Sequence, residues 1–352
     1  MAEKKIVCIT GMERSGTSML ARIVNILGVY LGPQDKLILE TDYNEKGCWE
    51  YRSFLEISDE ILKRFGGFTH QPPAFPIGWE NDSKLADLEE KAKELIEKEF
   101  ASKNVWGWKD TRSCLTLPFW NKLLPDMDHV ICVRNPSDVA KSLVARKWVD
   151  STTQALFVWL TYTASVLKHT ESKRRIIVFY EDFMSSNWNE EATRLAKFLG
   201  DSYVSTLKKS EHDIDGFITR GLQHYQTSLS TTMSNPEIPF VVKTFYFMLK
   251  QFAKGENESF LNYQGLKSTA LLNALAQQCC DTEEAKVFQL SKTLDATKTY
   301  AAELVEINLQ LEKQLKDKDL EINAKEQTIQ ALCSSYSWKL TAPLRSVFKH
   351  LK

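Results

Sequence analysis

The sequence predicts an α/β fold in which a parallel sheet is flanked by helices, and two observations carry this prediction. Four short runs are rich in β-branched and apolar residues, as expected of strands buried on both faces. Helical patterns alternate with these runs, which is typical of a doubly wound sheet. The predicted strands cover residues 6–10, 104–108, 129–133 and 175–180. The predicted helices cover residues 18–27, 51–65, 85–99, 138–145, 153–168 and 190–199.

Composition excludes several classes of protein. The 352 residues carry 45 Lys and Arg against 46 Asp and Glu, so no nucleic acid is expected as a partner. Seven scattered cysteines show neither the spacing of a zinc site nor that of a disulfide framework, and no metal is expected. The first residues lack a signal-peptide core, and no stretch is apolar enough to span a bilayer. A reduced, cytoplasmic protein is therefore expected.

The composition of the chain changes after about residue 225. We expect an α/β domain over residues 1–228, a helical connector over 229–282 with a helix at 239–254, a coiled coil over 283–333, and a basic amphipathic tail over 334–352. About seven heptads can be counted in the coiled coil. One seam is apolar except for Asn308, whereas the other includes Lys318 and Lys325. This pattern predicts a parallel homodimer with Asn308 fixing its register, and the alternative is a single helix docked on the core.

A glycine-bracketed loop directly follows the first predicted strand: Gly11-Met12-Glu13-Arg14-Ser15-Gly16-Thr17-Ser18. A loop between a strand and a helix presents backbone N–H groups to an anion. In nucleoside-triphosphate-hydrolysing enzymes Lys occupies the position of Thr17. Arg134 stands at the end of the third strand, where such enzymes usually have a magnesium-binding Asp. A kinase-like phosphotransferase is therefore an alternative that two residues disfavour.

Three motifs together resemble the sulfotransferases that use 3′-phosphoadenosine-5′-phosphosulfate (PAPS). The loop Arg14-Ser15-Gly16-Thr17-Ser18 is similar to their 5′-phosphosulfate loop. The segment Arg134-Asn135-Pro136-Ser137-Asp138-Val139-Ala140-Lys141-Ser142 is similar to their second motif, in which the Arg and the last Ser hold the 3′-phosphate. Tyr180-Glu181-Asp182-Phe183 resembles a Tyr-Glu-Asp-Leu segment beside the nucleotide.

The resemblance covers residues 5–225 and implies a P-loop nucleotide-kinase-like sulfotransferase fold. It implies PAPS as the co-substrate, with Arg14, Ser15, Gly16, Thr17 and Ser18 around the 5′-phosphosulfate. Arg134, Ser142 and Tyr180 would then bind the rest of the nucleotide. All these residues follow strand ends, where ligands of open α/β sheets bind.

Sulfuryl transfer needs cations that stabilise charge on the leaving phosphate oxygen. Arg14 is the first candidate. Lys109 is the second, because Trp108-Lys109-Asp110-Thr111-Arg112 follows the second strand. A similar Lys-Asp-Pro-Arg stretch occurs in bacterial members of the family, although here Thr111 replaces Pro.

The acceptor hydroxyl also needs a general base. Our choice is Glu50, since Asn44-Glu45-Lys46-Gly47-Cys48-Trp49-Glu50 resembles an Asn-x-x-Gly-x-Trp-Glu segment of bacterial sulfotransferases. The alternative is that Glu50 caps the following helix. Glu45, Glu40 and His70 are reserve candidates, and His70 lies in a predicted lid over residues 66–76.

The tail, Ser335-Tyr336-Ser337-Trp338-Lys339-Leu340-Thr341-Ala342-Pro343-Leu344-Arg345, resembles tails of bacterial glycosyltransferases that assemble glycans. That resemblance implies a carbohydrate or glycolipid acceptor in bacterial surface polysaccharide assembly. The basic amphipathic pattern also suits an anionic membrane, which would place the protein peripherally at the inner membrane face. A helix folded back on its own coiled coil is the alternative. A non-enzymatic coiled-coil scaffold is a further alternative for the whole chain.

Overall fold

The computed structural model describes residues 4–39, 46–170, 173–218 and 225–252, together with 318, 324–328 and 330–331. The chain divides into two compact units, Met1–Leu290 and Ser291–Lys352. In the second unit the described residues are helical. Most of the predicted coiled coil, including Asn308, and the whole tail lie outside the described residues. The homodimer, the register and the membrane contact therefore stay predictions.

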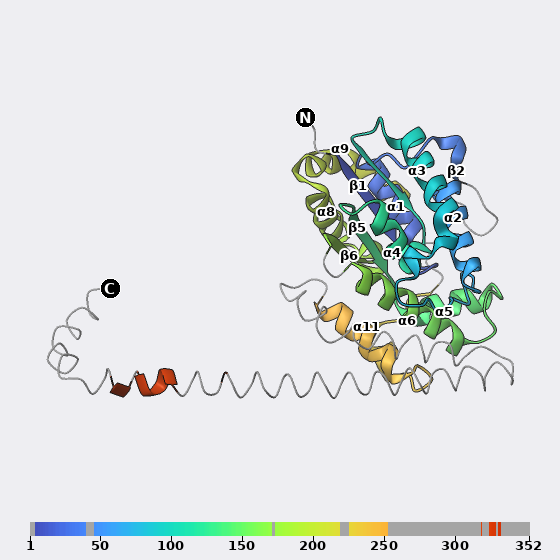
Figure 1. Ribbon diagram of the computed structural model, residues 1–352. Coiled ribbons are helices and arrows are strands. Elements are labelled where there is room, and N and C mark those ends of the chain that lie inside the picture. Colours follow the sequence, from blue (N-terminus) through green and yellow to red (C-terminus); the bar gives the residue numbers. More distant parts are fainter. Residues whose placement is uncertain are drawn as a thin grey trace. The chain divides into compact units, whose positions relative to one another are not determined.

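The first unit is built on a parallel sheet of four strands in the order β4-β1-β5-β6 (Figure 1). The strands are β1 (Lys5–Thr10), β4 (Val105–Lys109), β5 (Asp128–Val133) and β6 (Arg175–Phe179). Each begins or ends within one residue of its predicted bounds. Every residue of β5 and β6 is buried, which explains why these strands are continuous apolar runs instead of alternating ones. The predicted parallel α/β sheet is confirmed.

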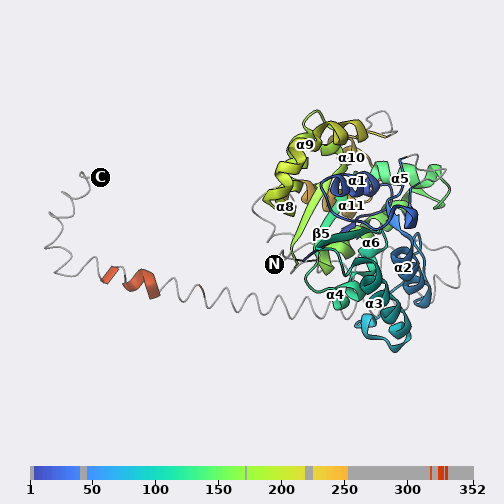
Figure 2. The same cartoon turned by 90° about the horizontal axis from the view of Figure 1, so that it is seen from above.

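Helices cover both faces of the sheet (Figure 2). Along β1, Val7 and Ile9 pack with α1 (Thr17–Ile26), α8 (Trp188–Leu199) and α9 (Asp201–Phe217). The intervening Cys8 belongs to the core of the opposite face. That face is covered by α2 (Arg52–Arg64), α3 (Ala86–Phe100), α4 (Ser113–Leu123), α5 (Pro136–Ala145) and α6 (Thr152–His169).

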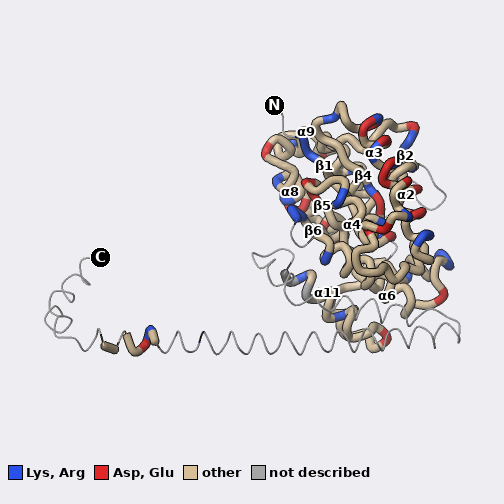
Figure 3. The backbone as a smooth tube through the Cα atoms, in the orientation of Figure 1, with Lys and Arg blue, Asp and Glu red and all other residues tan. Residues whose placement is uncertain are grey.

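Short elements complete the unit. A two-stranded antiparallel sheet pairs β2 (Leu37–Ile38) with β3 (Glu50–Tyr51). Three 3₁₀ turns cover Gln34–Lys36, Trp79–Asn81 and Ser83–Leu85. The helices α7 (Tyr180–Met184) and α10 (Leu229–Ser234) are single turns or little more. Along α2 and α3, basic and acidic residues are interspersed, in keeping with the near-neutral net charge (Figure 3).

Helix α11 (Phe240–Phe252) packs on the α/β core. The rings of Phe245 and Tyr246 lie about 6 Å from the ring of Trp159 in α6. Lys250 lies 3.5 Å from Glu181 and 3.6 Å from Asp182, both in α7. The segment predicted as a helical connector therefore contributes to the core of the first unit at least as far as this helix.

Candidate functional site

The carboxyl ends of the four strands bring the predicted motifs to one edge of the sheet. The glycine-bracketed loop follows β1, Asp110 follows β4, Arg134 follows β5 and Tyr180 follows β6. Parallel strands make this convergence necessary, because all their carboxyl ends point the same way. The sequence predicted this placement correctly.

Close backbone packing fixes the loop after β1. Gly11 has φ 147°, and a Cβ there would lie 2.2 Å from the carbonyl oxygen of Cys132. Gly16 has φ 89°, and its Cβ would lie 2.2 Å from the ring of Tyr180. Arg14 itself adopts a left-handed conformation, with φ 67°. The loop can pass this close to β5 and to Tyr180 because two of its residues lack a side chain.

Among the buried polar atoms without a hydrogen-bond partner in the described part of the chain, three lie in the first two motifs that resemble the sulfotransferases. They are the hydroxyls of Ser15 and Ser137 and the Nε of Arg134. Buried polar atoms are normally paired, so these three are available to a bound group or to an ordered water. All three can donate a hydrogen bond, which suits the oxygens of an anion. The residues therefore fit a bound phosphate or sulfate group.

Ser137 is a candidate ligand that the sequence reasoning did not single out. It lies in the first turn of α5, where Asn135 caps the helix by accepting a hydrogen bond from the Ser137 N–H at 2.9 Å. The signal was available in the Asn-Pro-Ser start of this helix, since first-turn residues face any anion bound at a helix N-terminus.

Arg14 and Arg134 lie in one cluster with Ser142. Nε of Arg14 donates to the Ser142 hydroxyl at 3.0 Å. The terminal nitrogens of Arg134 donate to the carbonyls of Arg14 at 3.1 Å and Tyr225 at 3.0 Å. The Arg134 guanidinium also lies 4.4 Å from the ring centre of Tyr180. The residues predicted for the two ends of the nucleotide are thus in direct contact.

Positive charges gather around Arg14. Burial lowers the pKa of Arg14 below its usual value, and the neighbouring guanidiniums of Arg146 and Arg134 lower it further, while the carboxylate of Glu13 opposes this shift. Like charges that are held close together and removed from water favour any ligand that neutralises them. An anion at this place would relieve the repulsion.

Lys109 and Glu50 form a buried ion pair. Nζ of Lys109 lies 2.7 Å from Oε1 of Glu50, and the two side chains are 4% and 10% exposed. Glu50 lies in β3, and no side chain caps helix α2, so the carboxylate contacts Lys109 instead of the helix start. The structure therefore brings together two of the residues predicted to be catalytic.

The loop after β4 is tied down by Arg112. The backbone N–H of Arg112 donates to Asp110 at 3.0 Å, and its guanidinium pairs with Asp59 of α2. Burial raises the pKa of Asp110 to about 6, and the charge of Glu50 adds to this shift while Arg112 opposes it. Asp110 is fully buried, and its hydrogen bond from the Arg112 N–H fixes the start of the loop.

The predicted lid contributes one polar contact to the phosphate-binding loop. Nε2 of His70 lies 2.7 Å from Oε2 of Glu13, and the imidazole stacks on Trp148 with the ring centres 5.3 Å apart. The reserve candidates Glu40 and Glu45 lie outside the described residues.

Five tryptophans of the first unit have different environments. Trp79, Trp106 and Trp108 are buried in the aromatic core. Trp49 is partly buried, its ring lying under the guanidinium of Arg22. Trp148, which stacks on His70, is therefore the tryptophan with the clearest position beside the loop.

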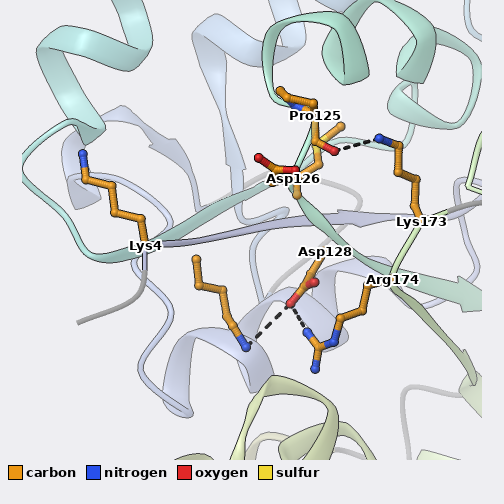
Figure 4. Close-up of a pocket in the computed structure, with 8 residues that line it drawn as sticks. Lys4, Pro125, Asp126, Asp128, Lys173 and Arg174 are labelled. Atoms are coloured by element: carbon orange, nitrogen blue, oxygen red, sulfur yellow. Dashed lines mark hydrogen bonds and ion pairs between the residues drawn. The ribbon is translucent and has the colours of Figure 1, made fainter. Parts of the chain in front are cut away.

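A separate pocket of about 530 Å³ lies at the amino ends of β1, β5 and β6 (Figure 4). Its lining carries four cationic side chains against two carboxylates, and Asp128 pairs with both Lys5 and Arg174. Lys173 donates to the carbonyl of Pro125 at 2.7 Å. This pocket is at the sheet edge opposite to the motifs and contains none of them.

No cluster of three or more potential metal-binding side chains occurs in the part of the chain that the structure describes. Over the same residues, no helix has the length and apolar character needed to cross a membrane.

Comparison with known proteins found similarity among solved structures. No protein-family model and no curated sequence matches the chain. Among solved structures, the fold is similar to that of sulfotransferase STF9 from Mycobacterium avium, with a TM-score of 0.39 and 13% sequence identity. The match covers 72% of this chain and 77% of that one.

Proposed function

We propose that this protein is a sulfotransferase that moves the sulfuryl group of PAPS to a hydroxyl of a carbohydrate acceptor. The observation that carries the proposal is the set of buried, unpartnered donors on Ser15, Ser137 and Arg134, beside a cluster of arginines at the carboxyl edge of the sheet. Such a set suits a ligand with two separate anionic groups. The three motifs that resemble PAPS-dependent enzymes contain all three of these residues.

The donor would be held at two points. Arg14 and the backbone from Ser15 to Ser18, which includes Gly16 and Thr17, are proposed for the 5′-phosphosulfate. Arg134 and Ser142 are proposed for the 3′-phosphate, and Tyr180 for the nucleotide between them. Support comes from the contact between Arg14 and Ser142, which brings the two groups of residues within one ligand's reach. When bound, PAPS supplies the activated sulfuryl group and the leaving phosphate.

Lys109 and Arg14 are proposed to stabilise the charge that develops on the leaving oxygen. Glu50 fixes the ammonium of Lys109 through the 2.7 Å contact. A fixed cation stabilises a transition state better than a mobile one, because no reorganisation is needed during the reaction. Glu50 is also the proton acceptor that the sequence favours.

The class of acceptor, the oligomeric state and the cellular location are proposed from the C-terminal segment. Its resemblance to tails of glycan-assembly enzymes supports a polysaccharide or glycolipid acceptor. The heptad pattern supports a homodimer, and the basic amphipathic end supports contact with an anionic membrane from the cytoplasmic side.

The reaction itself can be tested by incubating the full-length protein with PAPS and a panel of p-nitrophenyl hexosides. We expect adenosine 3′,5′-bisphosphate to accumulate, and the Ser137→Ala variant to need more PAPS for half-maximal rate. Ser165→Ala, in the last two turns of α6, is the matched control and should behave as the wild type. Transfer from ATP but not from PAPS would support the kinase-like alternative instead.

A further inference from the structure

The lid residue His70 is held at the tip of a tight turn. The backbone N–H of Phe68 donates to the carbonyl of Gln71 at 2.9 Å, and the reverse hydrogen bond measures 3.0 Å. At the tip, the carbonyl of Thr69 accepts a hydrogen bond from the buried hydroxyl of Tyr162 at 2.8 Å. Paired hydrogen bonds and a buried anchor fix the direction in which His70 leaves the backbone.

The imidazole is fixed as well. Trp148 stacks on it with an interplanar angle of 24°, and Glu13 holds Nε2 at 2.7 Å. The side chains of His70 and Glu13 are 22% and 18% exposed, so the contact is partly shielded but open on one side. Glu13 is the one hydrogen-bond partner of this imidazole among the described residues, which leaves Nδ1 available to a ligand.

The ionisation of Glu13 decides which nitrogen carries the proton. Burial acts to raise the pKa of Glu13, but the hydrogen bond from His70, the charge that His70 carries when protonated, and the nearby charges of Arg112 and Lys109 outweigh it and hold the pKa below its usual value. An ionised carboxylate can only accept, so Nε2 of a neutral His70 must carry the hydrogen. Nδ1 then presents a lone pair, as in other carboxylate-oriented histidines.

The position of this pair matches the expected place of transfer. Glu13 is the residue directly before Arg14 in the phosphate-binding loop. The charges of Lys109 and Arg112 act on Glu13, and Arg146 lies 5.7 Å from the ring centre of Trp148. Through Glu13 the imidazole contacts the phosphate-binding loop, next to Arg14 in the sequence and where the charge of Lys109 acts, and these are the two cations proposed for the leaving oxygen.

We propose that His70 is the general base of the reaction and that Glu13 is its positioning residue. The inference rests on the proposed sulfotransferase function. The acceptor oxygen forms a bond to sulfur while the bond from sulfur to the 5′-phosphate oxygen breaks. The hydroxyl proton passes to Nδ1 of His70, and adenosine 3′,5′-bisphosphate leaves. The resulting imidazolium is stabilised by Glu13 and later loses its proton to water.

Glu50 is less suited to this task than the sequence indicates. One of its oxygens already accepts from Lys109, and the two side chains are nearly closed to solvent. Using the carboxylate as a base would weaken its hold on Lys109 at the moment when that cation is needed. Assigning proton transfer to His70 leaves Glu50 to hold Lys109.

The test compares His70→Ala with His212→Ala, a control on the exposed side of α9. Release of adenosine 3′,5′-bisphosphate from PAPS is followed with p-nitrophenyl hexosides, and with water as the acceptor if no hexoside reacts. We expect His70→Ala to lower turnover by about 10²–10⁴ and to remove the acidic limb of the pH–rate profile. Added imidazole should restore part of the rate. His212→Ala should change neither property.

Binding separates this inference from the proposed function. His70→Ala should bind adenosine 3′,5′-bisphosphate within about twofold of the wild type, since the base does not hold the nucleotide. If the wild type does not bind this nucleotide, the proposed function fails. If it binds but His70→Ala keeps both its turnover and its acidic limb, the inference about His70 is wrong. Loss of that limb in Glu50→Gln, with His70→Ala unaffected, would assign the base to Glu50.

The role of Glu13 can be tested by a measurement that does not depend on enzymatic turnover. Nitrogen-15 NMR of the histidines at pH 8 should show His70 of the full chain with its hydrogen on Nε2. In Glu13→Gln the amide NH₂ can donate to Nε2, so a shift toward the other tautomer is expected together with a slower rate that imidazole does not rescue. An Nδ1–H tautomer in the wild type would overturn the assignment.

Discussion

Nζ of Lys109 lies 2.7 Å from Oε1 of Glu50, and both side chains are buried at the carboxyl edge of the sheet. The two residues are 59 positions apart and come from β4 and β3. A buried charge without a partner is strongly unfavourable, so each residue compensates the charge of the other and holds it in place. The pair is therefore both a structural contact and a part of the proposed reacting centre.

Replacing one member of the Lys109–Glu50 pair should destabilise the protein more than replacing both. We expect Lys109→Met to lower the free energy of unfolding by about 3–5 kcal/mol, because Glu50 is left as an unpaired buried charge. The double variant Lys109→Met with Glu50→Leu should regain most of this loss. Urea unfolding of the wild type, both single variants and the double variant measures the coupling. A double variant that is less stable than either single one would contradict the account.

The absence of a side chain at Gly16 should be necessary for nucleotide binding. Gly16→Ala would place a Cβ against the ring of Tyr180, so we expect affinity for adenosine 3′,5′-bisphosphate to fall at least about tenfold, or about 1.4 kcal/mol. Gly28→Ala is the matched control, because Gly28 also has a positive φ but an added Cβ there meets nothing within 4 Å. It should cost stability through backbone strain and leave the affinity unchanged. Equal affinity losses would show that strain alone explains the effect.

The sheet and the placement of its motifs could be predicted because local signals determine them. Apolar runs such as β5 and the glycine-bracketed loop are visible in the sequence, and the parallel arrangement then brings the strand ends together. Helix α4 was not predicted, since Pro118 lies inside it. The polar helix α9 was also missed, because its apolar stripe is narrow.

Contacts between distant segments could not be predicted. The pairing of His70 with Glu13 joins the lid to the phosphate-binding loop, and the pairing of Glu50 with Lys109 joins β3 to β4. No periodicity or spacing in the sequence specifies either contact, because each depends on how separate loops pack. Arg134 was predicted to hold a phosphate, whereas its contacts to the carbonyls of Arg14 and Tyr225 became visible only in the structure.

His129 should make stability depend on pH. Its side chain is fully buried in β5, and burial lowers its pKa to about 4, with Lys173 and Arg175 adding to the shift. As the pH falls below about 6.5, the unfolded chain takes up a proton that the folded chain does not. This contribution is complete above pH 6.5, and about 3 kcal/mol is lost by pH 4.

Replacing the histidine isolates this contribution from that of buried carboxyls such as Asp110, which act in the opposite direction. We expect His129→Leu to lose less stability than the wild type between pH 6.5 and 4, and the exposed-site control His212→Leu to match the wild type. Chemical unfolding at several pH values measures the difference. Parallel curves for the wild type and His129→Leu would show that this imidazole does not titrate as described.

The heptad segment should make the full chain a dimer. Light scattering of the full-length protein at tens of micromolar is expected to give twice the monomer mass of 40.4 kDa, and truncation after residue 280 should give the monomer. The truncated protein should also lose sedimentation with anionic vesicles, since two weak surface anchors bind better than one. A monomeric full-length protein would reject the homodimer and favour a different partner for the seam.

Calorimetric titration with adenosine 3′,5′-bisphosphate, run beside ATP, tests the central claim most directly. We expect the bisphosphate to bind and ATP to bind far more weakly. Arg134→Ala should reduce affinity for the bisphosphate by about 1.5–3 kcal/mol, as for a hydrogen bond to a charged group, and affect adenosine 5′-phosphosulfate much less. Arg174→Ala, at the opposite sheet edge, is the control. Preferential binding of ATP, or equal losses for both sulfotransferase ligands in Arg134→Ala, would contradict the assignment of this site.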